Sequence, residues 1–385
     1  MKNEYLNNQA LETEALYFDP SGRDITNMRF DENGFAHGNY PKKPKGVELL
    51  ENGDVVFRIF APNAKMVEVA GFGGRMSSEK VPMKKGENGL WEVTVSGIPG
   101  GFHYHDYFVD GNRVTSDLAP YGYGAFRSVN YFEKPDEGSG FYLLQDVPHG
   151  TIRMDYYKSS VTGKFRSCFV YTPPGYETDK DERYPVIYLQ HGGGEAETGW
   201  IWQGKIHYIM DNLIAQGACK KAIVVMNNGY AFVRSAIENP NMGSIGEVIV
   251  HDCVPFIDKK YRTIADRRFR AMAGLSMGAF QTQEVVFRHP DIFANLAMLS
   301  GTLQRRYEGD DYTAIFENPE VFKKDFGVFF LSMGSEEKSL IENNLSLAEE
   351  LRAKGVDVKT FVTPGYHEWE VWRYSIREFL RFAFQ

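Results

Sequence analysis

The stretch AGLSMGAF, residues 273 to 280, sets Ser276 between two glycines. An apolar run, residues 269 to 275, leads into the serine, and helical spacing follows it until Pro290. A strand, a glycine-flanked serine and a helix are the parts of a nucleophile elbow, in which small neighbours let the strand and the helix approach closely. The pattern predicts that Ser276 is an attacking nucleophile rather than an ordinary turn serine.

A serine hydroxyl is a weak nucleophile unless a base removes its proton, so a histidine and an orienting carboxylate are required as well. His367 stands just beyond the β-rich run 358 to 363, and Glu336 and Glu337 stand just beyond the run 327 to 333. Catalytic groups of parallel sheets gather at the carboxyl ends of strands. The order serine, acid, histidine is that of the α/β-hydrolase fold, and it leaves both glutamates open as the acid.

Donors for a developing oxyanion are expected in two places. The Met277 N–H lies at the start of the predicted helix, where it points toward negative charge. The loop HGGGEAETGW follows an earlier apolar run and supplies Gly193 and Gly194, whose N–H groups no side chain obstructs. His191, at the entrance of this loop, is interpreted as structural. Because these features and His367 occur in the required order, we expect a serine hydrolase.

The elements that must position these residues lie between residues 143 and 385. Apolar strand patterns alternate there with helical patterns, and helices are predicted over 206 to 217, 245 to 261 and 277 to 289. This alternation predicts a parallel sheet with crossover helices. Residues 133 to 142 are rich in charge and glycine and mark a domain boundary.

The residues before this boundary follow a different pattern. Residues 1 to 43 have little periodicity and are interpreted as an N-terminal extension. Residues 44 to 134 contain short alternating runs separated by turn clusters, which indicates an antiparallel β-sandwich. Trp91 is expected in its core. His103 and His105 are interpreted as a satisfied strand surface rather than a metal site.

Composition narrows the possible partners. The formal net charge of -8 provides no basic face for nucleic acid and disfavours anionic membranes. No apolar run approaches the roughly 18 residues of a spanning helix, and the N-terminal residues do not follow the basic-then-apolar order of a signal peptide. We therefore expect a soluble cytoplasmic chain, or an extracellular or periplasmic one if an export signal has been removed. The three cysteines are odd in number and widely spaced, which predicts buried thiols rather than a disulfide framework or a zinc site. Ester hydrolysis by a serine nucleophile needs no metal or organic cofactor, so none is expected.

Several longer stretches carry a family resemblance. YLQHGGGEAETGW, IVVMNNGY, FRAMAGLSMGAFQT, FFLSMGSEE and GYHEWEVWR are similar to the esterase family that contains feruloyl esterases of carbohydrate esterase family 1, over nearly all of residues 145 to 385. The resemblance implies an α/β-hydrolase fold with Ser276 as nucleophile and His367 as general base. It also implies Glu337 as the acid, with Glu336 as the alternative. Relatives often have Asp at this place, and Glu can hold an imidazole in the same way.

The N-terminal sandwich carries a second resemblance. FRIFAPNAKMVEVAG, GLWEVTV and YHDYFVDG resemble the immunoglobulin-like modules of carbohydrate-binding family 48. Sugar-binding members usually show several exposed tryptophans, whereas Trp91 is the only tryptophan here before Trp200. The missing tryptophans disfavour starch binding, and the resemblance implies an immunoglobulin-like β-sandwich domain in front of the α/β-hydrolase domain.

The family resemblance also implies a substrate class. The expected substrate is a small-molecule ester or a feruloylated oligosaccharide or polysaccharide, with arabinoxylan-linked ferulate preferred. Trp200, Trp202 and Trp369 are predicted to stack on an aromatic acyl group or a sugar ring, and Trp372 is expected in the core. An acetyl xylan esterase and a siderophore esterase of the ferric enterobactin type are alternatives with the same chemistry. A non-catalytic carbohydrate-binding protein is the alternative from another class.

Overall fold

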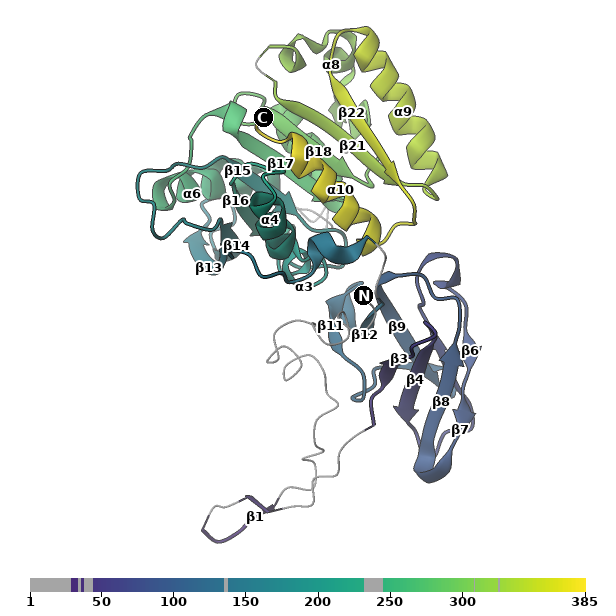
Figure 1. Ribbon diagram of the computed structural model, residues 1–385. Helices are drawn as coiled ribbons and strands as arrows, with labels where there is room; N and C mark the ends of the chain where they lie inside the picture. Colours follow the sequence, from purple (N-terminus) through teal and green to yellow (C-terminus); the bar gives the residue numbers. More distant parts are fainter. Residues whose placement is uncertain are drawn as a thin grey trace. The chain divides into compact units, whose positions relative to one another are not determined.

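The computed structural model describes residues 29–33, 36–37, 44–134, 138–231, 245–307, 309–324 and 326–385. The chain divides into two compact units, residues 1–140 and 141–385 (Figure 1). Most of the predicted N-terminal extension, residues 1 to 43, lies outside the described residues. Two short paired strands within it are described, β1 (Arg29–Phe30) and β2 (Ala36–His37).

The first unit contains two antiparallel sheets, which confirms the predicted β-sandwich. One sheet has the strand order β3-β4-β8-β7, and the other has the order β11-β12-β9-β5-β6 with β10 added beside β9. Their bounds are β3 Val47–Leu49, β4 Val55–Phe60, β5 Val67–Ala70, β6 Val81–Pro82, β7 Lys84–Lys85, β8 Leu90–Val95, β9 Gly101–Val109, β10 Asn112–Val114, β11 Tyr121–Gly124 and β12 Arg127–Lys134.

Side chains that alternate along these strands form the core between the sheets. Val55, Phe57 and Ile59 of β4 are buried, as the period of two requires. Trp91 is buried as predicted, and its Nε1–H donates to the Ala61 carbonyl at 2.9 Å. The partner for its indole N–H explains why a tryptophan can occupy this position.

The two histidines of β9 are interior residues, which corrects the prediction of a strand surface. His103 and His105 are both buried, because their face of β9 is the inner one. The ring of His105 lies 5.3 Å from that of Phe57, and burial lowers its pKa to about 3. His105 is therefore a neutral core residue.

The second unit is built on one eight-stranded sheet with the order β13-β14-β16-β15-β17-β18-β21-β22. In this order, adjacent strands from β16 to β22 run parallel, whereas β14 pairs antiparallel with β16 and β13 pairs antiparallel with β14. Their bounds are β13 Thr151–Lys158, β14 Phe165–Thr172, β15 Val186–Gln190, β16 Ile223–Asn227, β17 Arg270–Leu275, β18 Asn295–Leu299, β21 Val328–Gly334 and β22 Val358–Thr363. The central strands are buried on both faces, so they are continuous apolar runs.

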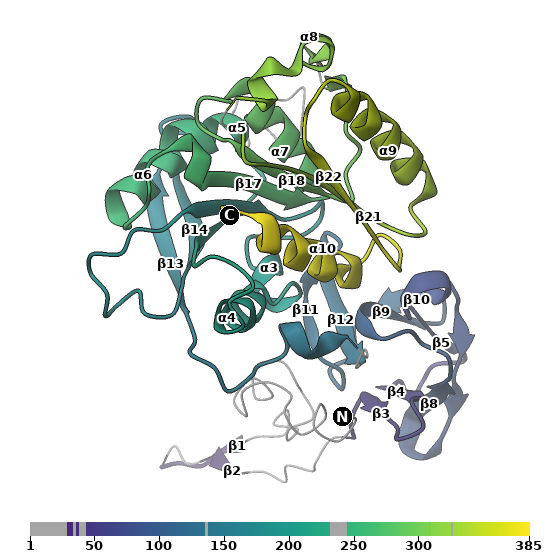
Figure 2. The same cartoon turned by 45° about the horizontal axis from the view of Figure 1, so that its top comes forward.

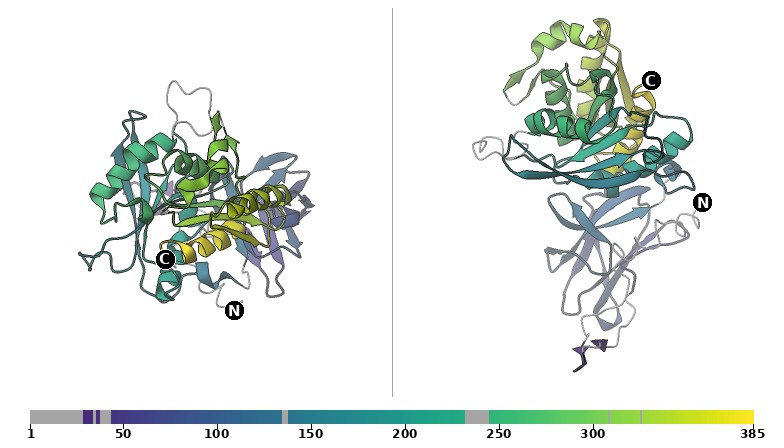
Figure 3. Two further views of the ribbon diagram at one scale, coloured as in Figure 1. Left: turned by 90° about the horizontal axis from the view of Figure 1, so that it is seen from above. Right: turned by 90° about the vertical axis from the view of Figure 1, so that its left-hand side faces the viewer.

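Helices cover both faces of this sheet, as Figure 2 shows and Figure 3 repeats from two further sides. α3, α4 and α10 lie on one face, and α5 to α9 lie on the other. Their bounds are α3 Gly199–Trp202, α4 Ile206–Ala215, α5 Ile245–Val248, α6 Val254–Lys260, α7 Met277–Arg288, α8 Thr313–Glu317, α9 Lys338–Ala353 and α10 Trp369–Phe382. The arrangement confirms the predicted α/β class with crossover helices.

The helix predicted over 245 to 261 is not one regular α-helix. A π-helical turn, Ile249–Cys253, separates α5 from α6. Pro255 is the second residue of α6, one position after this turn ends, and it lacks the N–H that a continuing α-helix would use there. The wider turn accommodates the proline ring without ending the helix.

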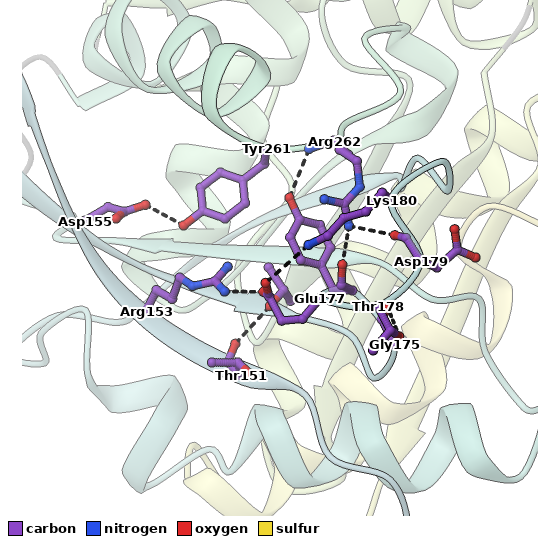
Figure 4. A network of polar contacts seen from close by, with 12 residues as sticks. Thr151, Arg153, Asp155, Gly175, Glu177, Thr178, Asp179, Lys180, Tyr261 and Arg262 are labelled. Carbon is purple, nitrogen blue, oxygen red and sulfur yellow. Dashed lines mark hydrogen bonds and ion pairs between the residues drawn. The ribbon is translucent and has the colours of Figure 1, made fainter.

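The antiparallel edge strand β13 is fastened by a network of polar contacts (Figure 4). Asp155 is buried and accepts hydrogen bonds from Lys260 and from the hydroxyl of Tyr261. Arg153, on the same strand, pairs with Glu177. Both sets of contacts join side chains of β13 to segments that follow it in the chain, and they add to the backbone pairing of β13 with β14.

Candidate active site

Ser276 stands at a strained turn between β17 and α7. Its φ is 51° and its ψ is -113°, a conformation that non-glycine residues rarely adopt. The Ser276 N–H donates to the Leu299 carbonyl of the neighbouring strand β18 at 2.9 Å, which fixes the turn. Met277 is the first residue of α7, so its N–H has no acceptor inside the helix. This is the geometry of the predicted nucleophile elbow.

The two glycines around Ser276 are required by close backbone contacts. A methyl group at Gly274 would lie 2.4 Å from the backbone carbonyl of Gly278. A methyl group at Gly278 would lie 2.7 Å from the carbonyl oxygens of Gln190 and His191. Any larger residue would push α7 away from β17 and from the loop after β15. The Gly-x-Ser-x-Gly pattern is thus explained by packing.

His367 and Glu337 meet at the carboxyl ends of β21 and β22. The imidazole Nδ1 lies 2.6 Å from Glu337 Oε1. The loop that carries His367 crosses back over the end of β21, since a methyl group at Gly334 would lie 2.5 Å from the Gly365 carbonyl oxygen. The side chain of His367 is 47% exposed and that of Glu337 is 6% exposed. The pair therefore has a buried acid and an imidazole open to solvent.

The second carboxylate oxygen of Glu337 is held as well. Oε2 accepts hydrogen bonds from the Gly334 N–H at 2.6 Å and from Ser300 Oγ at 2.7 Å. Burial alone would raise the pKa of Glu337, but the hydrogen bonds from His367, Gly334 and Ser300 outweigh it, so the pKa lies below its ordinary value. Glu337 is therefore ionised at neutral pH and fixed at both oxygens.

Glu336, the alternative acid, points elsewhere. It is exposed, and its Oε1 accepts a hydrogen bond from Ser335 Oγ at 3.2 Å. Only its backbone N–H is engaged near the histidine loop, with the Gly365 carbonyl as acceptor. Of the two adjacent glutamates, the fold brings Glu337 to His367.

The glycine loop after β15 runs directly beside the elbow. A methyl group at Gly192 would lie 3.5 Å from the Ser276 Cβ. The Gly194 N–H donates to the hydroxyl of Tyr230 at 2.7 Å, so this predicted oxyanion donor already has an acceptor. Gly193, its neighbour, remains the candidate donor of this loop. The role of Tyr230 was not predicted, because its partner lies 36 positions earlier in the chain.

His191 supports this loop through hydrogen bonds, which agrees with its interpretation as a structural residue. It is buried, and its Nδ1–H donates to the Gly192 carbonyl at 2.8 Å. Its Nε2 accepts from the Gly229 N–H at 2.8 Å. Burial lowers the pKa of His191, so the ring is neutral and serves as both donor and acceptor. It ties the loop after β15 to the loop after β16.

The predicted stacking tryptophans divide into two groups. Trp200 and Trp369 are buried and pack edge to face with centroids 5.4 Å apart, so neither ring offers a face to a substrate. This corrects the prediction for both: Trp200 donates to the Gln190 carbonyl at 2.9 Å, and Trp369 begins α10 against it. Trp202 is 46% exposed and remains a candidate for stacking on the substrate. Trp372 is buried as expected, with its ring edge-on to His367 at 5.1 Å.

Neither a metal-binding group nor a membrane-spanning helix is found among the described residues. Their His, Cys, Asp and Glu side chains form no group of three that could hold a metal ion. No described helix combines the length and the apolar character needed to cross a membrane. Cys168 and Cys253 are buried free thiols, and Cys219 is partly buried.

Comparisons with known proteins show which families the chain resembles. The family model described as "Putative esterase" matches residues 159–383, and the model described as "Carbohydrate-binding module 48 (Isoamylase N-terminal domain)" matches residues 44–122. An endo-1,4-beta-xylanase/feruloyl esterase of Xylanibacter ruminicola is 36% identical over 339 residues, which are 86% of this chain and 44% of that protein. The chain thus spans less than half the length of this relative.

Two solved structures are similar to the chain. One is a mutant of the feruloyl esterase module from Clostridium thermocellum, complexed with sinapinate, with a TM-score of 0.55 and 25% identity. The alignment covers 69% of this chain and 96% of the module. The enterobactin esterase from Shigella flexneri has a TM-score of 0.64 at 16% identity, and covers 88% and 96% of the two chains, a likeness of fold. Because the first family model covers more than half of the sequence, this chain belongs to the family of esterases that it describes.

Proposed function

We propose that this chain is a serine carboxylic-ester hydrolase with feruloyl esterase activity, with Ser276 as nucleophile, His367 as general base and Glu337 as the orienting acid. The observation that carries the proposal is the 2.6 Å hydrogen bond between His367 Nδ1 and Glu337 Oε1. It forms at the carboxyl ends of β21 and β22, and Ser276 lies at the carboxyl end of β17 in the same sheet. With the Nδ1 proton directed to Glu337, the lone pair of the neutral ring is on Nε2, which can accept a proton.

The reaction follows from these roles. His367 Nε2 takes the hydroxyl proton as Ser276 Oγ attacks the ester carbonyl, and the Glu337 carboxylate stabilises the imidazolium that forms. Collapse of the tetrahedral intermediate breaks the ester C–O bond, and the imidazolium gives its proton to the leaving alcohol. A water molecule then attacks the acyl-enzyme with His367 again as base, and the carboxylic acid is released.

Two backbone donors complete the proposed site. The oxyanion is assigned to the N–H groups of Met277 and Gly193, which need no reorganisation when charge develops. The Gly194 N–H, directed at Tyr230, then serves to hold the loop in shape. Because Gly194 has a φ of 78°, a glycine suits this turn.

The substrate assignment rests on the named relatives. The relative from Xylanibacter ruminicola is both a xylanase and a feruloyl esterase, and the Clostridium thermocellum module was solved with sinapinate, a hydroxycinnamate. We assign hydroxycinnamate esters of arabinoxylan as the substrate class of this chain. Trp202, exposed on α3 after the glycine loop, is the proposed stacking residue for the aromatic acyl group or a sugar.

The test is an ester panel with wild type and Ser276→Ala. Wild type should cleave methyl ferulate and feruloylated arabinoxylan faster than acetylated xylan or a ferric catechol ester, and Ser276→Ala should lower kcat by roughly 10³-fold or more. Preference for the catechol ester would favour a siderophore esterase, which the fold similarity to an enterobactin esterase makes the second candidate. Sugar retention without any ester cleavage would indicate a carbohydrate-binding protein and sink the proposal.

A further inference from the structure

Ser300 is an unusual residue immediately after β18, the strand between β17 and β21. Its φ is 50°, in the left-handed region that favours glycine, although it carries a side chain. Its N–H donates to the Ser332 carbonyl of β21 at 2.8 Å, and the side chain is buried. Backbone strain of this kind persists only where the surroundings enforce it, and it concentrates at functional sites.

The strained backbone directs the Ser300 hydroxyl to Glu337. Ser300 Oγ donates to Oε2 at 2.7 Å, and the Gly334 N–H donates to the same oxygen. Rotation of a carboxylate about its last torsion has only broad preferences, so a single donor does not fix its plane. Two donors on Oε2 hold the plane and leave Oε1 directed at His367.

We propose that Ser300 is a positioning residue of the reaction, one that locks the carboxylate of Glu337 so that Oε1 faces the imidazole of His367. The proposal rests on the proposed function, since Ser300 acts only through the other two residues. A glycine would suit the backbone better, and the serine is explained by its hydroxyl. Deleting that hydroxyl removes one charge-assisted hydrogen bond and should lower kcat/KM about tenfold.

Ser300→Gly and Ser300→Ala are the test variants, and Ser332→Ala is the matched control. Ser332 is a buried serine on the adjacent strand whose Oγ has no hydrogen-bond partner among the described residues. Ser300→Gly loses the hydroxyl but relieves the backbone strain, so its thermal midpoint should stay within about 3 °C of wild type or rise. Both Ser300 variants should lose about tenfold in kcat/KM, while Ser332→Ala stays within about twofold.

The pH dependence separates positioning from simple packing. The Ser300 hydrogen bond is one of those that lower the pKa of Glu337, so without it the carboxylate attracts a proton on His367 more strongly. The acid limb of the kcat/KM profile, which reports the general base, should then move to higher pH. The charged or titratable groups beside Glu337 are His367, which it contacts, and its chain neighbours Glu336 and Lys338; all three are unchanged in these variants. Ser332→Ala should keep the profile of wild type.

A readout that needs no turnover completes the test. In protein labelled with ¹⁵N-histidine, the His367 resonances should shift in Ser300→Gly and stay in place in Ser332→Ala. A Ser300→Gly variant with full activity, an unmoved acid limb and unshifted His367 resonances would overturn the proposal. If the wild type cleaves no ester but the resonances still shift, the proposed function fails, while the effect of Ser300 on His367 through Glu337 stands.

Discussion

Glu337→Gln is the most informative single substitution at this site, with Glu336→Gln as its matched control. Glu337 accepts three hydrogen bonds, from His367 Nδ1, Ser300 Oγ and the Gly334 N–H, and so uses both oxygens as acceptors. Glutamine has the same shape but replaces one acceptor with an NH₂ donor. In either orientation of the amide, at least one donor then faces another donor.

The expected loss can be worked from these contacts. A hydrogen bond to a charged group contributes about 1.5–3 kcal/mol, which corresponds to roughly 10- to 150-fold in rate. A buried donor left facing another donor adds a further penalty of about 1–3 kcal/mol. Together these contributions are about 2.5–6 kcal/mol, so Glu337→Gln should lower kcat/KM by about 10²- to 10⁴-fold. Glu336 is exposed and bonds to Ser335 Oγ, so Glu336→Gln should stay within about twofold of wild type.

Initial rates on methyl ferulate, measured near neutral pH for both variants and wild type, give the comparison directly. Thermal unfolding of each variant accompanies the assay, so that lost activity is not mistaken for lost fold. A larger loss in Glu336→Gln than in Glu337→Gln would refute the reasoning, because it would place the working carboxylate at the exposed side chain. Equal activity of Glu337→Gln and wild type would refute it equally.

Three further outcomes follow from the contacts described. Gly278→Ala should destabilise the fold by about 1–3 kcal/mol, because the added methyl would lie 2.7 Å from two carbonyl oxygens, and an unchanged thermal midpoint would contradict this packing. Asp155→Ala should destabilise it by about 2–3 kcal/mol, seen as a lower urea midpoint, since the Tyr261 hydroxyl and Lys260 lose their buried acceptor; no change would mean that the network in Figure 4 adds nothing. The folded pKa of Glu337 lies below its ordinary 4.5, so its contribution to stability is complete above pH 4.5 and is lost as the pH falls through the folded value. Urea unfolding across this range should show that part of the pH dependence in wild type and not in Glu337→Gln.

Much of the architecture could be predicted because it is written in local patterns. Alternating apolar residues identified Trp91 as core, and the strand–serine–helix order identified the elbow of Ser276 before any contact was known. The helix over 245 to 261 was misjudged at its middle, where a π-helical turn precedes Pro255 and periodicity alone does not reveal it. His103 and His105 were misjudged because period two gives the face but not which face is buried.

The site could be predicted only down to the level of its segments. Two adjacent glutamates were equivalent on paper, and the turn after β21 decided that Glu337 is directed to His367 while Glu336 is directed to solvent. Trp200 and Trp369 gave the same signal as Trp202, yet the first two are packed against each other. Which ring stays exposed depends on the packing of helices far apart in the sequence.

By itself, then, the sequence determined the two-unit organisation, the alternation of strands and helices, and the serine, acid and histidine segments at strand ends, since each depends on spacing between near neighbours. The tertiary structure alone decided the hydrogen bond from Ser300 to a carboxylate 37 positions later and the one from Gly194 to Tyr230. Those contacts arise because strand order and loop crossings bring distant residues within about 3 Å, a distance that no local pattern encodes.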